Sequence, residues 1–255
     1  MKHGLAVILM ILAALAAARP VLDFRNDLAF QSATVNRFAA QVYDKRLARL
    51  EGEHRLDRDP ALLKRLRGLL ARLLPAADYE RPGAAKLAWE IHICRHCGEN
   101  ASAMAGGKLM VGEAFIAQLR PTDAELAYLL AHEMGHVLAE HTREFATSAR
   151  FFVGMGMQRE YSDIQHEIDE SFSLQLRLAP LYRQQELEAD YIGFILGAHA
   201  GFRPAGMLSL LHKLGGDSEG RTLLDAHPTT RQRLDQAEAM LPAAERLYAQ
   251  GLPRR

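Results

Sequence analysis

Residues 131–137, AHEMGHV, place an HExxH pattern inside a strongly apolar stretch. On an α-helix, residues four apart lie on one face, so His132 and His136 can converge on a single metal ion. Glu133 directly follows the first histidine, where its carboxylate can meet a water molecule on the metal rather than the metal itself. Two histidines on an apolar face can also be hydrogen-bonded core residues. Because the spacing matches that of a zinc site, we predict a metal centre.

A helix start precedes this motif. Thr122 is followed three residues later by Glu125, which is the sequence pattern of a capping box. Apolar residues then recur at helical spacing as far as Val137. The sequence therefore predicts that the HExxH motif lies on a capped helix that begins near residue 122.

A third metal ligand must come from elsewhere in the chain. The longer pattern HExxHxxGxxH would need glycine and histidine where Ala139 and Thr142 stand, so that class of zinc site is excluded. The other class takes a glutamate from a later helix. Glu186, in the segment ELEAD, lies in a helical run that extends to about His199, and we predict it to be the third ligand.

One face of this later helix is expected to carry two acidic residues and two glycines: Glu186, Asp190, Gly193 and Gly197. The glycines would let that face pack closely against the HExxH helix. Asp190, one turn after the ligand, would then accept the free ring N–H of a ligand histidine. Glu188 points to another face in this arrangement and is given no role.

The composition is that of an ordinary globular protein. The 255 residues carry no net charge and 49% of them are hydrophobic, which argues against a disordered or nucleic-acid-binding tail. We therefore expect no nucleic-acid partner. Residues 19–255 are predicted to form one domain, with N-terminal helices in 19–80, a core carrying both motifs in 84–200, and further helices in 201–255.

The first 18 residues differ from the rest. Lys2 and His3 form a short basic start, residues 5–17 are an unbroken apolar run, and alanines stand at positions 16 and 18. This pattern is typical of a signal peptide over residues 1–18 and predicts an exported, periplasmic protein. The alternative is an uncleaved anchor that holds the protein at the membrane facing the periplasm, although the run is shorter than the ~20 residues that span a bilayer.

The residue pattern changes after position 83. Residues 86–93 alternate between apolar and polar and predict a strand, residues 94–107 are typical of a turn, and residues 108–112 predict a second short strand. In an exported protein, Cys94 and Cys97 are expected to form a local disulfide rather than a zinc knuckle or a redox site.

The second strand is a candidate for substrate binding. If it lies at the edge of a small sheet, an extended peptide can add to it as a further strand. This hypothesis assigns substrate contact to four residues: Lys108, Leu109, Met110 and Val111. The alternative is a purely structural hairpin.

Four stretches in combination resemble the family-forty-eight zinc metallopeptidases, a gluzincin family. They are Asn100–Val111, the HEMGH helix, the ELEAD segment, and His227-Pro228 with Arg233. The resemblance implies an α+β, mainly α fold, in which a zincin-like metalloprotease domain has a small β-sheet beside the HExxH helix.

The resemblance also implies roles for single residues. One Zn²⁺ per chain would be held by three ligands: His132, His136 and Glu186. Glu133 would be the catalytic base, His227 would lie over the metal as a second catalytic residue, and Arg233 would support the site. Ser102 departs from the family pattern, which often has an aromatic or apolar residue at that position.

The function implied is that of a zinc-dependent endopeptidase of the cell envelope. Its substrates would be misfolded or unassembled exported polypeptides, and an envelope protein is a further candidate partner. The alternative is a latent or inactive zinc protein that acts as a chaperone-like binding factor. Residues 145–157 would be either core or a mobile lid over the site. The sequence carries no signal for an oligomeric state.

Overall fold

The computed structural model describes residues 28–98, 100–153, 159–215 and 230–252. The expected signal peptide, residues 1–18, and the proposed catalytic His227 lie outside the described residues. Residues 154–157 of the segment considered as a lid also lie outside them.

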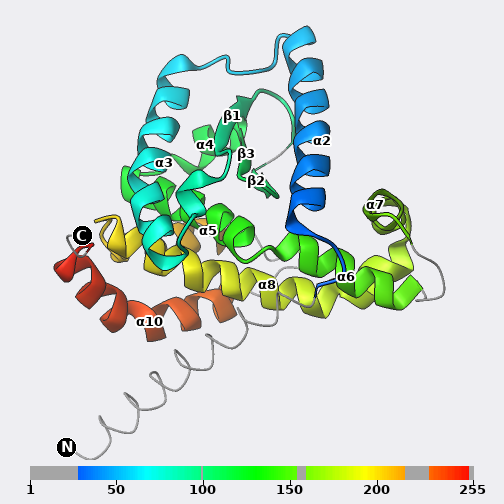
Figure 1. Ribbon diagram of the computed structural model, residues 1–255. Helices are drawn as coiled ribbons and strands as arrows, with labels where there is room; N and C mark the ends of the chain where they lie inside the picture. The colour runs from blue at the N-terminus through cyan, green and yellow to red at the C-terminus, as the bar shows by residue number, and fades with distance from the viewer. Residues whose placement is uncertain (1–27, 99, 154–158, 216–229, 253–255) are drawn as a thin grey trace, which may run out of the picture.

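The described residues form a mainly helical fold with one small sheet, which confirms the expected α+β class (Figure 1). The strands are β1 (Glu90–Cys94), β2 (Ala101–Met104) and β3 (Lys108–Gly112). The helices up to the HExxH helix are α2 (Ser32–Gly52), α3 (Pro60–Glu80), the short 3₁₀ helix η2 (Ala84–Lys86), α4 (Glu113–Leu119) and α5 (Asp123–Leu138). The later helices are α6 (His141–Val153), α7 (Tyr161–Glu170), α8 (Phe172–His199), α9 (Ala205–Gly215) and α10 (Thr230–Gln250). In this part of the chain, no helix combines the length and apolarity needed to cross a bilayer.

The sheet lies above α5, between α2 and α3 (Figure 1). Its strand order is β1-β3-β2, with β1 parallel and β2 antiparallel to β3. β2 falls within the stretch 94–107, for which the sequence predicted only a turn, so that prediction was wrong. A disulfide joins Cys94, the last residue of β1, to Cys97.

The central place of β3 corrects the substrate-binding hypothesis for Lys108, Leu109, Met110 and Val111. These residues pair with β1 on one side and with β2 on the other, so their backbone groups are not free to bind a peptide. The side chains of the last three are only 1% exposed. Among the described strands, β2 and not β3 is the edge on the side of α5.

Helices α5 and α8 pack against each other at backbone distance. Gly193 on α8 lies over the backbone of His132, so that a Cβ at residue 193 would come within 2.8 Å of the His132 nitrogen. Gly135 on α5 lies equally close to the Ala189 carbonyl oxygen. A side chain at either glycine would force the two helices apart. This contact brings the face of α8 that carries Glu186 onto the HExxH face of α5.

α8 begins well before the ELEAD segment. Ser171 precedes it, and Ser171 Oγ accepts a hydrogen bond from the Leu174 N–H and caps α8. From there α8 runs without a break through Pro180 to His199. α10 likewise continues past Pro242 to Gln250. Packing against other helices outweighs the loss of one backbone hydrogen bond at each proline.

The N-terminus of α5 is held by the predicted capping box and by α9. Thr122 Oγ1 accepts from the Glu125 N–H, and the Glu125 carboxylate accepts from the Thr122 N–H. The same carboxylate is buried and also accepts hydrogen bonds from Ser209 and Lys213 of α9. Burial raises the pKa of Glu125, but these donors outweigh it and hold the pKa at about 2.

Replacing Gly193 with alanine tests the close contact between α5 and α8. The new methyl group meets backbone atoms of α5 that cannot move singly, so we expect Gly193→Ala to lower the free energy of unfolding by about 1–3 kcal/mol. Urea unfolding followed by circular dichroism measures it. Gly68 on α3 is the matched control, since a Cβ there meets nothing within 4 Å and alanine should stabilise by ~0.5–1 kcal/mol. Equal effects at the two positions would contradict the contact.

Glu125→Gln tests the buried carboxylate at the start of α5. Its folded pKa of about 2 lies below the ordinary glutamate value of 4.5, so its contribution to stability is present above pH 4.5 and is lost as the pH falls to about 2. We expect the variant to lose about 2–3 kcal/mol near neutral pH, and the deficit to shrink below pH 4.5. Chemical denaturation over this pH range measures it. A deficit that does not change with pH would contradict the assignment.

Candidate metal centre

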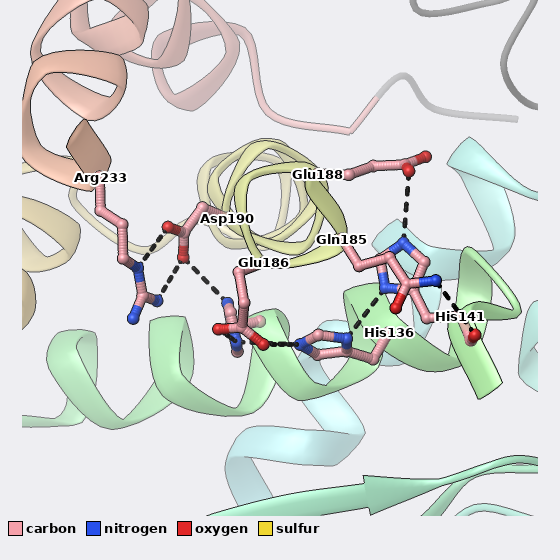
Figure 2. A network of polar contacts seen from close by, with 8 residues as sticks. His136, His141, Gln185, Glu186, Glu188, Asp190 and Arg233 are labelled. Atoms are coloured by element: carbon pink, nitrogen blue, oxygen red, sulfur yellow. Dashed lines mark hydrogen bonds and ion pairs between the residues drawn. The ribbon is translucent and has the colours of Figure 1, made fainter. Parts of the chain in front are cut away.

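Three donor groups from α5 and α8 face one another. The Nε2 atoms of His132 and His136 lie 3.1 Å apart. Glu186 of α8 approaches both of them. Its Oε1 lies 3.2 Å from His136 Nε2 (Figure 2), and its Oε2 lies 3.6 Å from His132 Nε2. The spacing of the histidines on α5 and the glycine contact with α8 together produce this convergence.

The arrangement of these donors fits a metal ion. Their ligand atoms all lie within 4.8 Å of one another, and within the described ranges no other group of His, Cys, Asp or Glu meets this criterion. If each ring carries its proton on Nδ1, two nitrogen lone pairs and a carboxylate face one small space, which is favourable only around a cation. Two imidazoles and one carboxylate are the donor set of catalytic zinc sites, which leave a position open.

The Nδ1 side of His132 is held by a buried ion pair. Nδ1 lies 2.9 Å from Asp190 Oδ1, and Asp190 also accepts two hydrogen bonds of 2.6 Å from Arg233 of α10. Burial alone would raise the pKa of Asp190, but the hydrogen bonds from Arg233 and His132 outweigh it and lower the pKa. Asp190 therefore stays ionised and accepts the His132 Nδ1–H, which leaves Nε2 free for a metal.

The Nδ1 side of His136 meets a pair of residues to which the sequence reasoning gave no role. His141 Nδ1 lies 2.9 Å from His136 Nδ1, and His141 Nε2 lies 3.3 Å from Glu188 Oε2 (Figure 2). Glu188 does point to a different face of α8 from Glu186, as expected, but α6 turns back so that His141 reaches it. A third histidine five residues after His136 was the signal in the sequence that could have drawn attention to this pair.

Glu133 lies beside the donor cluster and lines the same cavity. Its side chain is buried, and burial raises the pKa of Glu133. Tyr182, one turn before Glu186 on α8, also lines the cavity, and burial raises the pKa of its hydroxyl, which hydrogen-bonds to Glu186. Tyr182 had no assignment from the sequence.

The cavity has a volume of about 580 Å³. The edge strand β2 lines it through Ala101, Ser102 and Ala103. Apolar side chains from five helices line it as well: Phe115, Leu129, Phe145, Ile168, Met207, Leu210 and Leu214. The space therefore combines one polar, acidic centre with apolar walls and a strand edge.

A comparison with known families identifies the chain. The sequence pattern of peptidase family M48 matches residues 60–241, a range that contains all the donor residues described above. The chain belongs to peptidase family M48. This membership agrees with the resemblance seen in the sequence motifs and with the mainly helical, zincin-like fold.

Individual relatives are metallopeptidases by name. The chain is 33% identical over 160 residues to the mitochondrial metalloendopeptidase OMA1 of Arabidopsis thaliana, which covers 60% of this chain and 32% of that protein. The chain is 31% identical over 172 residues to OMA1 of Schizosaccharomyces pombe, a match that covers 64% of this chain and 50% of that protein. The metalloprotease LoiP of Escherichia coli is 29% identical over 150 residues, covering 52% of this chain and 55% of LoiP. The chain thus spans between about a third and a half of the length of these OMA1 relatives.

The residues predicted from the sequence separate into two groups in this M48 domain. Six lie together at the centre: His132, Glu133, His136, Glu186, Asp190 and Arg233. The four β3 residues do not line the cavity, and neither do Cys94 and Cys97, whose disulfide closes the end of β1. Of the segment 145–157, Phe145 lines the cavity, whereas Phe151 is 66% exposed at the end of α6.

Asp190→Ala tests the buried ion pair behind His132. The Arg233 side chain is 15% exposed, and removal of Asp190 leaves this buried charge without its carboxylate. We expect the metal-free protein to lose about 3–5 kcal/mol in free energy of unfolding, measured by urea denaturation in a chelator. Asp235→Ala is the matched control, because Asp235 pairs with Arg231 where both side chains are exposed. A loss as large in the control would contradict the role of burial.

Proposed function

We propose that this M48 domain is a zinc-dependent endopeptidase. The observation that carries the proposal is the convergence of His132, His136 and Glu186 beside Glu133, in a cavity that a strand edge also lines. The names of the relatives support the class of reaction. A purely structural zinc site would have no use for the buried carboxylate of Glu133 or for an open cavity.

In peptide hydrolysis, the residues of the cavity would have separate roles in holding the metal, moving the proton and stabilising the oxyanion. A zinc ion in this site would activate water and polarise the scissile carbonyl. Glu133 would accept the proton of the attacking water and pass it to the departing amine. His227 stays a proposed donor to the oxyanion on the family resemblance alone.

The substrate we propose is an extended polypeptide that adds to the edge of β2. Ala101, Ser102 and Ala103 line the cavity, and their small side chains leave space for a peptide backbone to approach. β2 is antiparallel to β3 and has no further partner among the described strands. Only a segment that is not already folded can bind in this way, which favours misfolded or unassembled proteins as substrates.

The compartment we propose is the cell envelope, reached by export. The disulfide between Cys94 and Cys97 supports it, because such bonds form and persist in oxidising compartments such as the periplasm. The apolar run of residues 5–17 supports it as well. The mitochondrial setting in the OMA1 names belongs to those relatives.

Glu133→Gln separates metal binding from catalysis. Glutamine has the shape of glutamate but cannot accept the proton, so we expect zinc content to persist while cleavage of unfolded casein falls by at least about 10²-fold. Glu186→Ala is expected to lose both zinc and cleavage. Metal analysis and a casein assay on the purified proteins measure these quantities. Cleavage by Glu133→Gln at the wild-type rate would reject the base, and zinc without cleavage in the wild type would favour the chaperone-like alternative.

A further inference from the structure

We propose that His141 and Glu188 act as a positioning pair that fixes the tautomer and the ring orientation of His136. The inference rests on the proposed function, in that it takes the donor cluster to hold zinc. It assigns to two residues outside the cluster a role in keeping one ligand atom pointed at the metal.

The contacts form a continuous path from α8 to the cluster. Glu188 Oε2 lies 3.3 Å from His141 Nε2, and His141 Nδ1 lies 2.9 Å from His136 Nδ1. His136 Nε2, on the other side of the same ring, faces Glu186 Oε1 at 3.2 Å. Figure 2 shows the rings of His136 and His141 between the two glutamates.

A count of protons leaves one arrangement for this path. A metal at His136 Nε2 requires the lone pair there, so the ring proton of His136 must lie on Nδ1. Two nitrogens 2.9 Å apart cannot both carry a proton in one hydrogen bond, so His141 Nδ1 must accept. The proton of neutral His141 then lies on Nε2, where Glu188 accepts it. Glu188 therefore selects the tautomer of His141, and His141 selects that of His136.

The local backbone holds His141 in this position. Glu140, between α5 and α6, has φ +54°, a left-handed backbone conformation that residues other than glycine rarely adopt. Its carboxylate is held by Ser32 Oγ at 2.7 Å and by Arg143 at 2.6 Å. The turn ends α5 and starts α6 at once, so that the side chain of His141 returns to the HExxH face. Gln185 of α8 donates to the His141 carbonyl oxygen at 3.2 Å.

The alternative is that His141 only fills space in the core. Its side chain is 3% exposed, as a filler would be. Both ring nitrogens, however, face polar partners, Nδ1 toward His136 and Nε2 toward Glu188, which packing does not require. Asp190 contacts His132 Nδ1 directly and fixes the tautomer of that ring in the same way. Each of the two histidine ligands therefore has one supporting contact on its Nδ1 side. Both arrangements begin at a carboxylate of α8: Asp190 contacts its histidine directly, whereas Glu188 acts through His141.

The test compares zinc affinity in the full chain, by competition with a chromophoric chelator, for His141→Phe, Glu188→Ala and Glu188→Gln. We expect zinc binding to weaken about 10–100-fold in His141→Phe and about 10-fold in Glu188→Ala. Glu188→Gln keeps an acceptor oxygen and should stay within about threefold of the wild type. In the zinc-loaded wild type, ring ¹⁵N spectra should show His136 protonated on Nδ1, with a changed signal in Glu188→Ala.

The matched control is the pair formed by His166 and Glu170 on α7, where both side chains are 70% exposed. His166→Phe and Glu170→Ala should leave zinc affinity unchanged. The inference is overturned if His141→Phe and Glu188→Ala both bind zinc as the wild type does. It is also overturned if their losses only follow a fall in the unfolding midpoint of the metal-free protein. A wild type that binds no zinc would instead reject the proposed function.

Discussion

Helices α5 and α8 approach each other so closely that their backbones are in contact, and this contact depends on glycine at the crossing. Gly193 lies over the backbone of His132, and Gly135 lies against Ala189. With larger residues there, Glu186 would stand back from the histidines by the width of a side chain, and the three donors would not meet around one ion. The metal centre is therefore a property of the helix crossing as much as of its ligands.

Charge balance in the cavity supports the same conclusion. Three buried carboxylates line it, from Glu133, Glu186 and Asp190, and among the described lining residues Arg233 is their cationic counterpart. With neutral histidines and all three carboxylates ionised, these mostly buried side chains carry an excess of two negative charges. Buried charge of this kind is costly unless it is paired, and a divalent cation would neutralise it.

Local periodic patterns were sufficient to predict much of the centre. The capped HExxH helix and the shared face of Glu186 and Asp190 follow from helical spacing, and the structure places these residues accordingly. β2 was missed because its four residues, three of which have small side chains, carry little pattern, and their place comes from pairing with β3. The contact between His141 and Glu188 was missed because a left-handed residue, Glu140, separates two helices, so helical spacing cannot predict across it.

Glu186, Glu188 and Asp190 lie within little more than one turn of α8, and each reaches a different part of the centre. An insertion of one residue before this segment would rotate all three carboxylates together by about 100°. One histidine would then lose its support from Asp190, the other its support through His141, and both their shared ligand. A single substitution in this segment therefore removes one contact, whereas a change in its length would displace all three carboxylates at once.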